Sequence, residues 1–198
     1  MAFDVVPPAD VLARTAEALS RNGFEAVVAS DGADAKQRAL ALVPADAEVM
    51  VMTSVTLDTL GISRALEGHP GSARRKLAGG SLSPRDKKTI GCVPGVVLGS
   101  VHAVTQDGHV LIASASGSQL PAHVYGAGKV IWVAGGQKVV ADTQEGIRRV
   151  YEHCLPLEDA RARKVYGVGS AVNNLLIMNA HSPQGRITLI LVPEKLGF

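Results

Sequence analysis

The most informative part of this sequence is VTQDGHVLIASASGSQLP (residues 104–121), which is followed by VYGAGKVIWVAGGQK (residues 124–138). In the first segment two apolar runs flank Asp107-Gly108, and an Asp-Gly pair between such runs predicts a β-hairpin. A loop rich in serine and glycine comes next. The second segment holds a strongly apolar strand that ends in Gly-Gly-Gln-Lys. The pattern is typical of a scaffold that presents polar groups at the ends of strands.

Upstream of this stretch, helical and strand patterns alternate. We expect a helix capped by Asp10 and ending near Asn22, a strand over 24–29, a helix over 33–43 and a strand over 48–53. Such alternation predicts an α/β fold of layered α/β/α type with a mainly parallel sheet. The hairpin over 102–113 would add an antiparallel element to that sheet.

Downstream, Asp142 and Glu145 resemble a capping box and predict a helix that contains Cys154. We expect Pro156 to end this helix, because proline lacks the amide hydrogen that the helix needs. A charged helix over 157–166, an irregular segment over 167–185 and a last strand over 186–192 complete the chain. Residues 69–91 are polar and broken by glycine and proline, so we expect a mobile loop with a helical segment, or a small lid, within a single domain that spans 1–198.

The composition bounds the classes of function. The chain has 198 residues, and 46% are hydrophobic against 19% charged, which is enough for a sizeable core. Only 4% are aromatic and the net charge is +2, which argues against a nucleic-acid partner. No apolar run approaches the roughly 20 residues that span a bilayer, and the start of the sequence does not read as a signal peptide. We therefore expect a cytoplasmic protein with no membrane partner.

The titratable residues give no metal signal. Cys92 and Cys154 lack Cys-x-x-Cys spacing, so we expect two reduced thiols and no metal site. His102, His109 and His123 are isolated in sequence, and we interpret them as structural or surface residues.

Hydroxyl side chains gather where the strand over 48–53 gives way to a helix. Thr53, Ser54 and Thr56 lie at this junction. Free amide groups and the helix dipole favour an anion there, and the hydroxyls add donors. The alternative is an ordinary Ser/Thr cap of the following helix.

Three segments together resemble the LUD domain family, the lactate-utilisation proteins of the LutC/YkgG type. They are TSVTLDTLGI (53–62), GSQLPAHVYGAGKVIWVAGGQK (117–138) and RITLILVPEKLGF (186–198), and the match keeps its order over nearly the whole chain. The resemblance implies a fold of the NagB/RpiA/CoA-transferase group, in which the loops after the strands bind phosphorylated sugars, CoA thioesters or folates. It places residues 53–56 at the first anion-binding loop of that group.

The resemblance also extends the candidate site. Gly135 and Gly136 would form a backbone cradle, with Lys138 as a cation. Ligands in open α/β sheets gather at the carboxyl ends of strands, so these loops are expected to share one cleft. Ser116, Gly117, Ser118 and Gln119 either hydrogen-bond a ligand there or cap a helix that starts near residue 120.

Two features depart from the family. The region before the last strand, over 167–174, has no cysteine, so no iron–sulfur cluster is expected in this chain. No glutamate reads as the nucleophile of a CoA-transferase, because Glu145 is explained by helix capping. The identity of any cofactor stays open.

Three functions remain. The chain is an accessory or catalytic component of lactate or similar organic-acid utilisation that acts with redox partner proteins. Alternatively, it is a stand-alone enzyme for a phosphorylated or carboxylated metabolite, or a non-catalytic binding or regulatory module. In the enzyme, Asp107 would act as the acid/base and Lys138 would hold charge on an oxyanion. The alternative for Asp107 is turn chemistry alone. The expected ligand is a small anionic metabolite, and a homodimer is compatible with the aliphatic composition.

Overall fold

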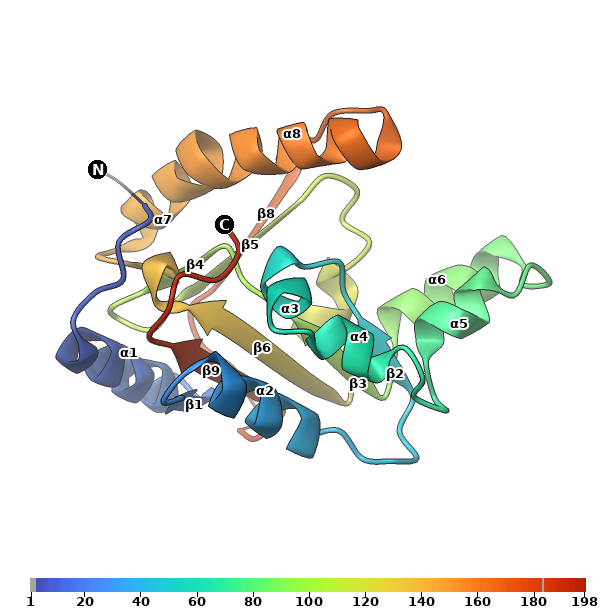
Figure 1. The fold of residues 1–198 in the computed structure, drawn as a ribbon, viewed down its shortest axis with the longest axis horizontal. Helices are drawn as coiled ribbons and strands as arrows, with labels where there is room; N and C mark the ends of the chain where they lie inside the picture. Colours follow the sequence, from blue (N-terminus) through green and yellow to red (C-terminus); the bar gives the residue numbers. More distant parts are fainter. Residues whose placement is uncertain (1–2, 183) are drawn as a thin grey trace.

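The computed structural model describes residues 3–182 and 184–198, and its centre is a five-stranded parallel sheet (Figure 1). The strands follow the order β1-β9-β6-β3-β2. Their bounds are β1 (Glu25–Val28), β2 (Val49–Val51), β3 (Val96–Gly99), β6 (Lys129–Gly135) and β9 (Ile187–Val192). Because every neighbouring pair is parallel, the five carboxyl ends lie along the same edge of the sheet.

A second sheet contains the predicted hairpin. Its strands follow the order β7-β4-β5-β8, with bounds β4 (Ala103–Thr105), β5 (Val110–Ser114), β7 (Val139–Val140) and β8 (Asn174–Met178). The antiparallel pairing of β4 with β5 confirms the hairpin. Two expectations were wrong. The hairpin does not join the parallel sheet, and part of the segment over 167–185 forms β8 through its pairing with β5. The residue pattern over 174–178 does not by itself indicate a strand that pairs with β5.

Apart from the edge strand β1, which is largely exposed, the parallel sheet is buried on both faces, so its other strands read as continuous apolar runs. In β6, Val130 and Trp132 point into one core cluster, while Ile131 and Val133 point into another. The first cluster also holds α1 (Ala9–Arg21) and the second sheet. The other holds the helices of the opposite face, which are α2 (Gly32–Ala41), α3 (Val55–Thr59) and α4 (Ile62–Leu66). The layered α/β fold with a mainly parallel sheet is thereby confirmed.

Trp132 is packed in the first cluster against the π-helical turn η1 (Ala122–Gly126). Its Nε1 donates a hydrogen bond to His123 Nδ1 at 3.2 Å, and both side chains are buried. Burial lowers the pKa of His123 to about 4, and the nearby Arg186 charge adds to this effect. His123 is therefore a neutral core residue.

One helical path continues through Pro156. It consists of α7 (Thr143–Arg149), the π-helical turn η3 (Val150–Cys154) and α8 (Leu155–Tyr166). Asp142 caps α7 by accepting from the Glu145 amide, as predicted. The expected break at Pro156 was wrong. The wider π turn just before the proline relieves the clash of its ring with the preceding turn, and Pro156 sits in the first turn of α8. α7 packs on β4, β5 and β7, and α8 runs on along the same side of the molecule (Figure 1).

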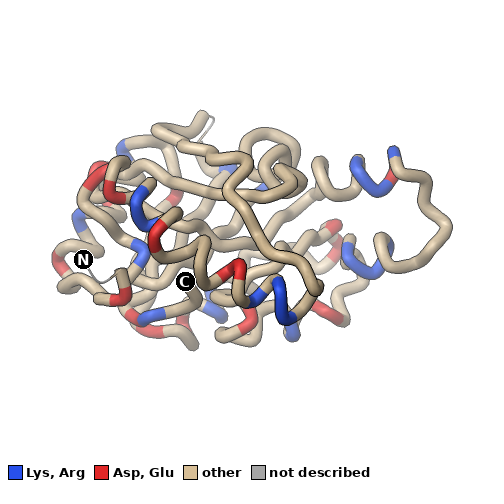
Figure 2. The backbone as a smooth tube through the Cα atoms, turned by 90° about the horizontal axis from the view of Figure 1, so that it is seen from above, with Lys and Arg blue, Asp and Glu red and all other residues tan. Residues whose placement is uncertain are grey.

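One smaller expectation also changes. Helix α1 starts at Ala9 after Pro8, and Asp10 lies in its first turn paired with Arg14, so Asp10 is not the cap. Residues 69–91, expected as a mobile loop with a helical segment or as a small lid, contain the helix α5 (Ala73–Ala78) and most of α6 (Pro84–Cys92). They form an arm that projects beyond β2 and β3 and carries a concentration of basic residues (Figures 1 and 2). A lid role for this arm stays a prediction.

Candidate functional site

A cleft with a cavity volume of about 280 Å³ opens at the carboxyl end of the parallel sheet. Loops that follow β2, β3 and β5 line it, together with the 3₁₀ turn η2 (Gly136–Lys138) that follows β6. The path from η3 through α8 supplies a further wall. The lining residues are Met52, Thr53, Ser54, Val55, Thr56, Ser100, Val101, His102, Ala113, Ser114, Ala115, Ser116, Ser118, Gln119, Lys138, Val150, Cys154, Leu155, Glu158, Arg161, Tyr166, Ser170, Ala171, Val172 and Phe198.

Most of the predicted ligand-binding residues meet in this cleft. Thr53, Ser54 and Thr56 lie on one wall, and Ser116, Ser118 and Gln119 come from the loop after β5. Lys138 also lines the cleft and contacts Thr56 through its Nζ. Gly117 is not itself a lining residue, but its φ of 75° shapes the loop between Ser116 and Ser118. Residues 53–56 and Lys138 come together because they follow parallel strands whose carboxyl ends lie along one edge. The loop over 116–119 comes to the same cleft from β5 of the second sheet.

Some of these side chains also have the structural roles that were the alternatives. Ser54 caps α3 by accepting from the Leu57 amide at 3.3 Å. Gln119 Nε2 donates to the Ala113 carbonyl at 3.2 Å, and the Ser116 and Ser118 hydroxyls bond to each other at 2.9 Å. Thr53 Oγ1 accepts from Arg74 of the projecting arm at 3.0 Å. The loops are thus held in place by their own hydrogen bonds before any ligand enters.

Asp107 lies outside the cleft. It sits at the turn of the hairpin with 59% of its side chain exposed, and its carboxylate accepts from Thr105 Oγ1. Asn22 holds the turn against α1 by donating to the Asp107 carbonyl at 2.9 Å. The cleft lies at the opposite end of β5 from this turn. The two ends are roughly 17 Å apart, because β5 has 5 residues and each extends the strand by about 3.4 Å. The predicted acid/base role of Asp107 was therefore wrong, and turn chemistry accounts for its contacts.

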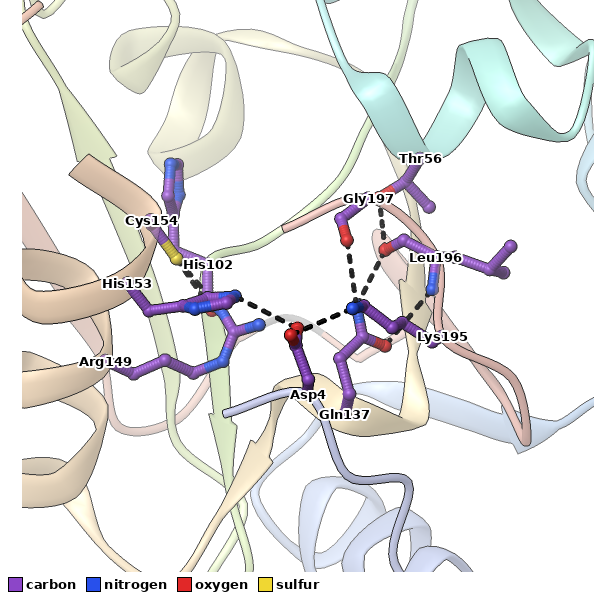
Figure 3. A network of polar contacts seen from close by, with 10 residues as sticks. All are labelled: Asp4, Thr56, His102, Gln137, Arg149, His153, Cys154, Lys195, Leu196 and Gly197. Atoms are coloured by element: carbon purple, nitrogen blue, oxygen red, sulfur yellow. Dashed lines mark hydrogen bonds and ion pairs between the residues drawn. The ribbon is translucent and has the colours of Figure 1, made fainter. Parts of the chain in front are cut away.

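The two glycines after β6 are not a ligand cradle either. Gly135 and Gly136 are buried and do not line the cleft. A Cβ atom on Gly135 would lie 2.7 Å from the Leu196 amide nitrogen, so the space beside this glycine is filled by the chain's own segment over 194–197. Gln137 fixes that segment by donating to the Leu196 carbonyl at 3.0 Å and accepting from the Leu196 amide at 3.2 Å (Figure 3).

Lys138 is the buried cation at the floor of the cleft, with 2% of its surface exposed. Its Nζ donates to Thr56 Oγ1 at 2.9 Å, to Ser100 Oγ at 3.0 Å and to the Val101 carbonyl at 3.2 Å. None of these partners is a carboxylate. Burial is the main cause that lowers the pKa of Lys138 to about 7, and the neighbouring Arg149 charge lowers it further.

Arg149 is a second buried cation behind the cleft wall. Its Nη1 donates to the His102 carbonyl and to Cys154 Sγ, the latter at 2.9 Å (Figure 3). Its Nε and Nη2 are buried and find no hydrogen-bond partner among the described residues. Burial is the main cause that lowers the pKa of Arg149, while Cys154 and, after it, Asp4 act in the opposite direction. Two buried cations without a buried carboxylate make this region electropositive.

His102 lines the cleft as a neutral imidazole. Burial, Lys138 and Arg149 lower its pKa to about 3. The Ala113 amide donates to His102 Nδ1 at 3.2 Å, which places the proton of the neutral ring on Nε2. From the sequence, His102 was expected to be a structural or surface residue, and neither Ser100 nor Arg149 was a candidate for the site. Ser100 directly follows β3, so the strand-end rule that selected Thr53 would have found it. No local signal distinguished Arg149 from the exposed Arg148.

Helix α8 brings a paired acid and base to the mouth of the cleft. Arg161 contacts Glu158 through two hydrogen bonds of 2.7 Å and lies 5.5 Å from the centre of the Tyr166 ring. Glu158 is the only carboxylate side chain among the described lining residues, and Arg161 neutralises it. The electropositive floor therefore keeps its charge uncompensated.

Two general findings concern the described part of the chain. Residues 3–182 and 184–198 contain no group of three or more histidine, cysteine, aspartate or glutamate side chains placed to hold a metal ion. In the same ranges no helix is both long enough and apolar enough to cross a membrane.

Comparison with known proteins adds a family and a fold. A model of the LUD domain matches residues 12–192. The crystal structure of a DUF162 family protein from Deinococcus radiodurans is similar, with a TM-score of 0.54 over 93% of this chain and 97% of that chain. The two sequences are 14% identical, so this likeness concerns the fold alone. No curated protein matches the chain.

Proposed function

Because this chain belongs to the LUD domain family, we propose that it serves the utilisation of lactate or a similar organic acid by binding a small anionic metabolite in the cleft. Family membership supports a protein related to lactate utilisation. The finer statement, that the cleft holds an anion, is supported by its charge and its donors.

The observation that carries the proposal is the buried cation Lys138 at the cleft floor. It donates only to neutral oxygens, and Arg149 behind it has two nitrogen atoms without a partner among the described residues. Burying a charge without a counter-charge is costly. A carboxylate or phosphate in the cleft would supply the missing negative charge, and in a site of low dielectric its attraction to these cations would be strong.

The walls provide groups that would orient such a ligand. The hydroxyls of Thr53, Ser116 and Ser118 lie on the two sides of the floor. A 2-hydroxy acid needs donors for its carboxylate and a partner for its hydroxyl, which this arrangement offers. The volume of about 280 Å³ suits a small metabolite, while a larger ligand such as a CoA ester would extend out of the cleft.

A thermal-shift experiment tests the proposal. The ligands are lactate, a phosphorylated sugar, a CoA ester and a folate, with lactamide as the uncharged counterpart of lactate. We expect an anionic ligand to raise the melting temperature and lactamide to leave it unchanged. At a ligand concentration of 100 times the Kd, the free energy of unfolding should rise by about 2.7 kcal/mol.

Two matched pairs of variants locate the site. Lys138→Met should weaken anion binding about 10- to 100-fold, because hydrogen bonds to a charged group contribute about 1.5–3 kcal/mol. Lys87→Met on the exposed arm should bind normally. Thr53→Ala and the exposed Thr89→Ala form the second pair. The proposal fails if no anion stabilises the protein, or if Lys138→Met binds as well as Lys87→Met.

The remaining expectations stay predictions. They concern redox partner proteins, a homodimer and a cytoplasmic location. A stand-alone enzyme remains the alternative function, and the arrangement of Ser100 beside Lys138 favours it.

A further inference from the structure

The Ser100 hydroxyl lies 3.0 Å from the Lys138 amine and opens into the cleft. We propose that Ser100 and Lys138 are a nucleophile and its general base, and that they catalyse acyl transfer from an ester or thioester bound in the cleft. This goes beyond binding of an anion and gives the cleft a reaction of its own. Serine–lysine pairs are a known variant of the activated-serine arrangement.

The hydrogen bonds around Lys138 direct its lone pair toward Ser100. A neutral amine has two N–H groups and one lone pair, and Nζ has three neighbours. The Val101 carbonyl can only accept, so it takes one N–H. Thr56 gives its own proton to the Leu196 carbonyl at 3.1 Å, so Thr56 Oγ1 also accepts from Lys138. Ser100 Oγ has two possible acceptors, Thr56 Oγ1 at 3.3 Å and Lys138 Nζ at the shorter 3.0 Å. When the amine is neutral, Val101 and Thr56 take both of its N–H groups, so its lone pair faces the Ser100 hydroxyl and can accept the proton.

The same contacts select Ser100 over Thr56 as the nucleophile. Thr56 is 1% exposed and its hydroxyl proton is held by a buried carbonyl. Ser100 is only partly buried and lines the cleft at the carboxyl end of β3. A substrate carbonyl entering the cleft would therefore meet Ser100 Oγ.

The groups around Lys138 favour its neutral form. Burial is the main cause that lowers its pKa to about 7, and Arg149 of α7 adds to this effect. Cys154 of η3 acts in the opposite direction, while His102 after β3 is neutral. His153, also on η3, is influenced by the Lys138 charge, and burial lowers its pKa. With a pKa of about 7, Lys138 is present near neutral pH both as the cation that would bind an anion and as the unprotonated base that this reaction needs.

The reaction balances without a further reagent. Ser100 Oγ attacks the carbonyl carbon, and its proton moves to Lys138 Nζ. The bond from that carbon to the leaving oxygen or sulfur breaks, and Lys138 returns the proton to the leaving group. Water then attacks the acyl-serine and gives a proton to Lys138, which passes it to Ser100 Oγ as the carboxylic acid leaves. No atom is oxidised or reduced.

A neutral donor for the developing oxyanion is present in the lining. His102 lies two residues after Ser100 and carries its proton on Nε2, because its Nδ1 accepts from the Ala113 amide. A neutral imidazole can donate to an oxyanion and cannot protonate the Lys138 base, so it suits this role.

A fluorophosphonate probe tests the pair, because this uncharged reagent phosphonylates an activated serine and needs no anion site. We expect one adduct on the peptide that contains Ser100, detected by mass spectrometry of the folded protein. Labelling should be lost in Ser100→Ala and kept in the matched control Ser81→Ala on the exposed arm. The rate should rise with pH through about 7 and then level, as Lys138 loses its proton. Hydrolysis of p-nitrophenyl acetate should fall at least about 100-fold in Ser100→Ala.

Lys138→Met should also abolish the adduct, and circular dichroism will show whether this variant folds. If it does not fold, the pH profile of the wild-type protein and Ser100→Ala still test the pair. The proposal is overturned if Ser100 stays unlabelled while a reference serine hydrolase reacts, if the labelling rate does not depend on pH between 5 and 9, or if folded Lys138→Met labels as fast as wild type. Since the probe is neutral, its result is independent of whether anions stabilise the protein.

Discussion

Replacing the buried Arg149 with methionine should make the protein more stable and its cleft a weaker binder of anions. Methionine has a similar length and no polar atoms, so it can fill the same space. Arg149 is fully buried, with Nε and Nη2 unsatisfied, and among the described residues its side-chain hydrogen bonds are those of Nη1. The substitution therefore removes two unsatisfied nitrogen atoms, which together carry three N–H groups, and breaks two hydrogen bonds.

The magnitude follows from those contacts. Each buried polar atom without a partner costs about 1–3 kcal/mol, so the loss of Nε and Nη2 removes a cost of about 4 kcal/mol. The hydrogen bond from the charged guanidinium to the His102 carbonyl contributes about 1.5–3 kcal/mol, and the weaker one to Cys154 Sγ contributes about 0.5–1 kcal/mol. The net gain is about 1 kcal/mol, at the lower end of the range of about 1–4 kcal/mol seen when buried ionic groups become apolar. For a domain of this size that corresponds to an increase in melting temperature of roughly 2–4 °C.

Urea denaturation followed by circular dichroism measures the change in free energy of unfolding. Arg148→Met is the matched control, because Arg148 is the exposed neighbour that pairs with Glu152. An exposed pair of this kind contributes about 0–1 kcal/mol, so the control should be nearly neutral. In parallel, anion binding measured by calorimetry should weaken in Arg149→Met only. The opposite result would be a free energy of unfolding for Arg149→Met that is more than about 1 kcal/mol below that of the wild-type protein. In that case the guanidinium has partners beyond the two hydrogen bonds of Nη1, and Arg149 is not an uncompensated buried cation.

Three further predictions concern pH, the hairpin and the rejected acid/base. The pKa of His123 is about 4 in the folded protein and 6.5 in the unfolded chain. Between pH 6.5 and pH 4 the unfolded chain therefore binds more protons than the folded protein, and the free energy of unfolding falls as the pH decreases. For this group the loss is about 3 kcal/mol. His123→Gln, which keeps an acceptor for Trp132, should flatten this dependence in urea titrations at pH 7 and pH 4.5, and an unchanged slope would contradict it. Gly108→Ala should lower the free energy of unfolding by at least about 2 kcal/mol more than Gly80→Ala does. Both glycines have positive φ, but only at Gly108 would a Cβ atom meet the main chain of α1, at 2.6 Å from the Ala18 carbonyl carbon. Equal losses measured by calorimetry would refute this. Asp107→Ala should leave the anion-induced thermal shift at the wild-type value, and a lost shift would return Asp107 to the site.

The elements that the sequence predicts correctly depend on neighbours in the chain. A continuous apolar run marks β6, and Asp107-Gly108 marks the turn between β4 and β5, because each pattern acts over a few residues. The errors have a common cause. β8 exists through its pairing with β5, and the helix through Pro156 exists because a π turn precedes the proline. Both depend on interactions that residue patterns do not contain.

The candidate site divides in the same way. From the sequence alone, Thr53 and Lys138 could be placed at carboxyl ends of strands, and parallel strands bring such ends to one edge. Asp107 was misassigned because a turn aspartate and a catalytic aspartate look alike until the position of the hairpin is known. Only the tertiary structure brings Ser100 and Thr56 within hydrogen-bonding distance of Lys138, and only it buries Arg149 without a carboxylate partner. The physical reason is that burial and the distances between residues far apart in the chain set both the pKa of the lysine and the charge of the cleft, and neither quantity belongs to a local stretch of sequence.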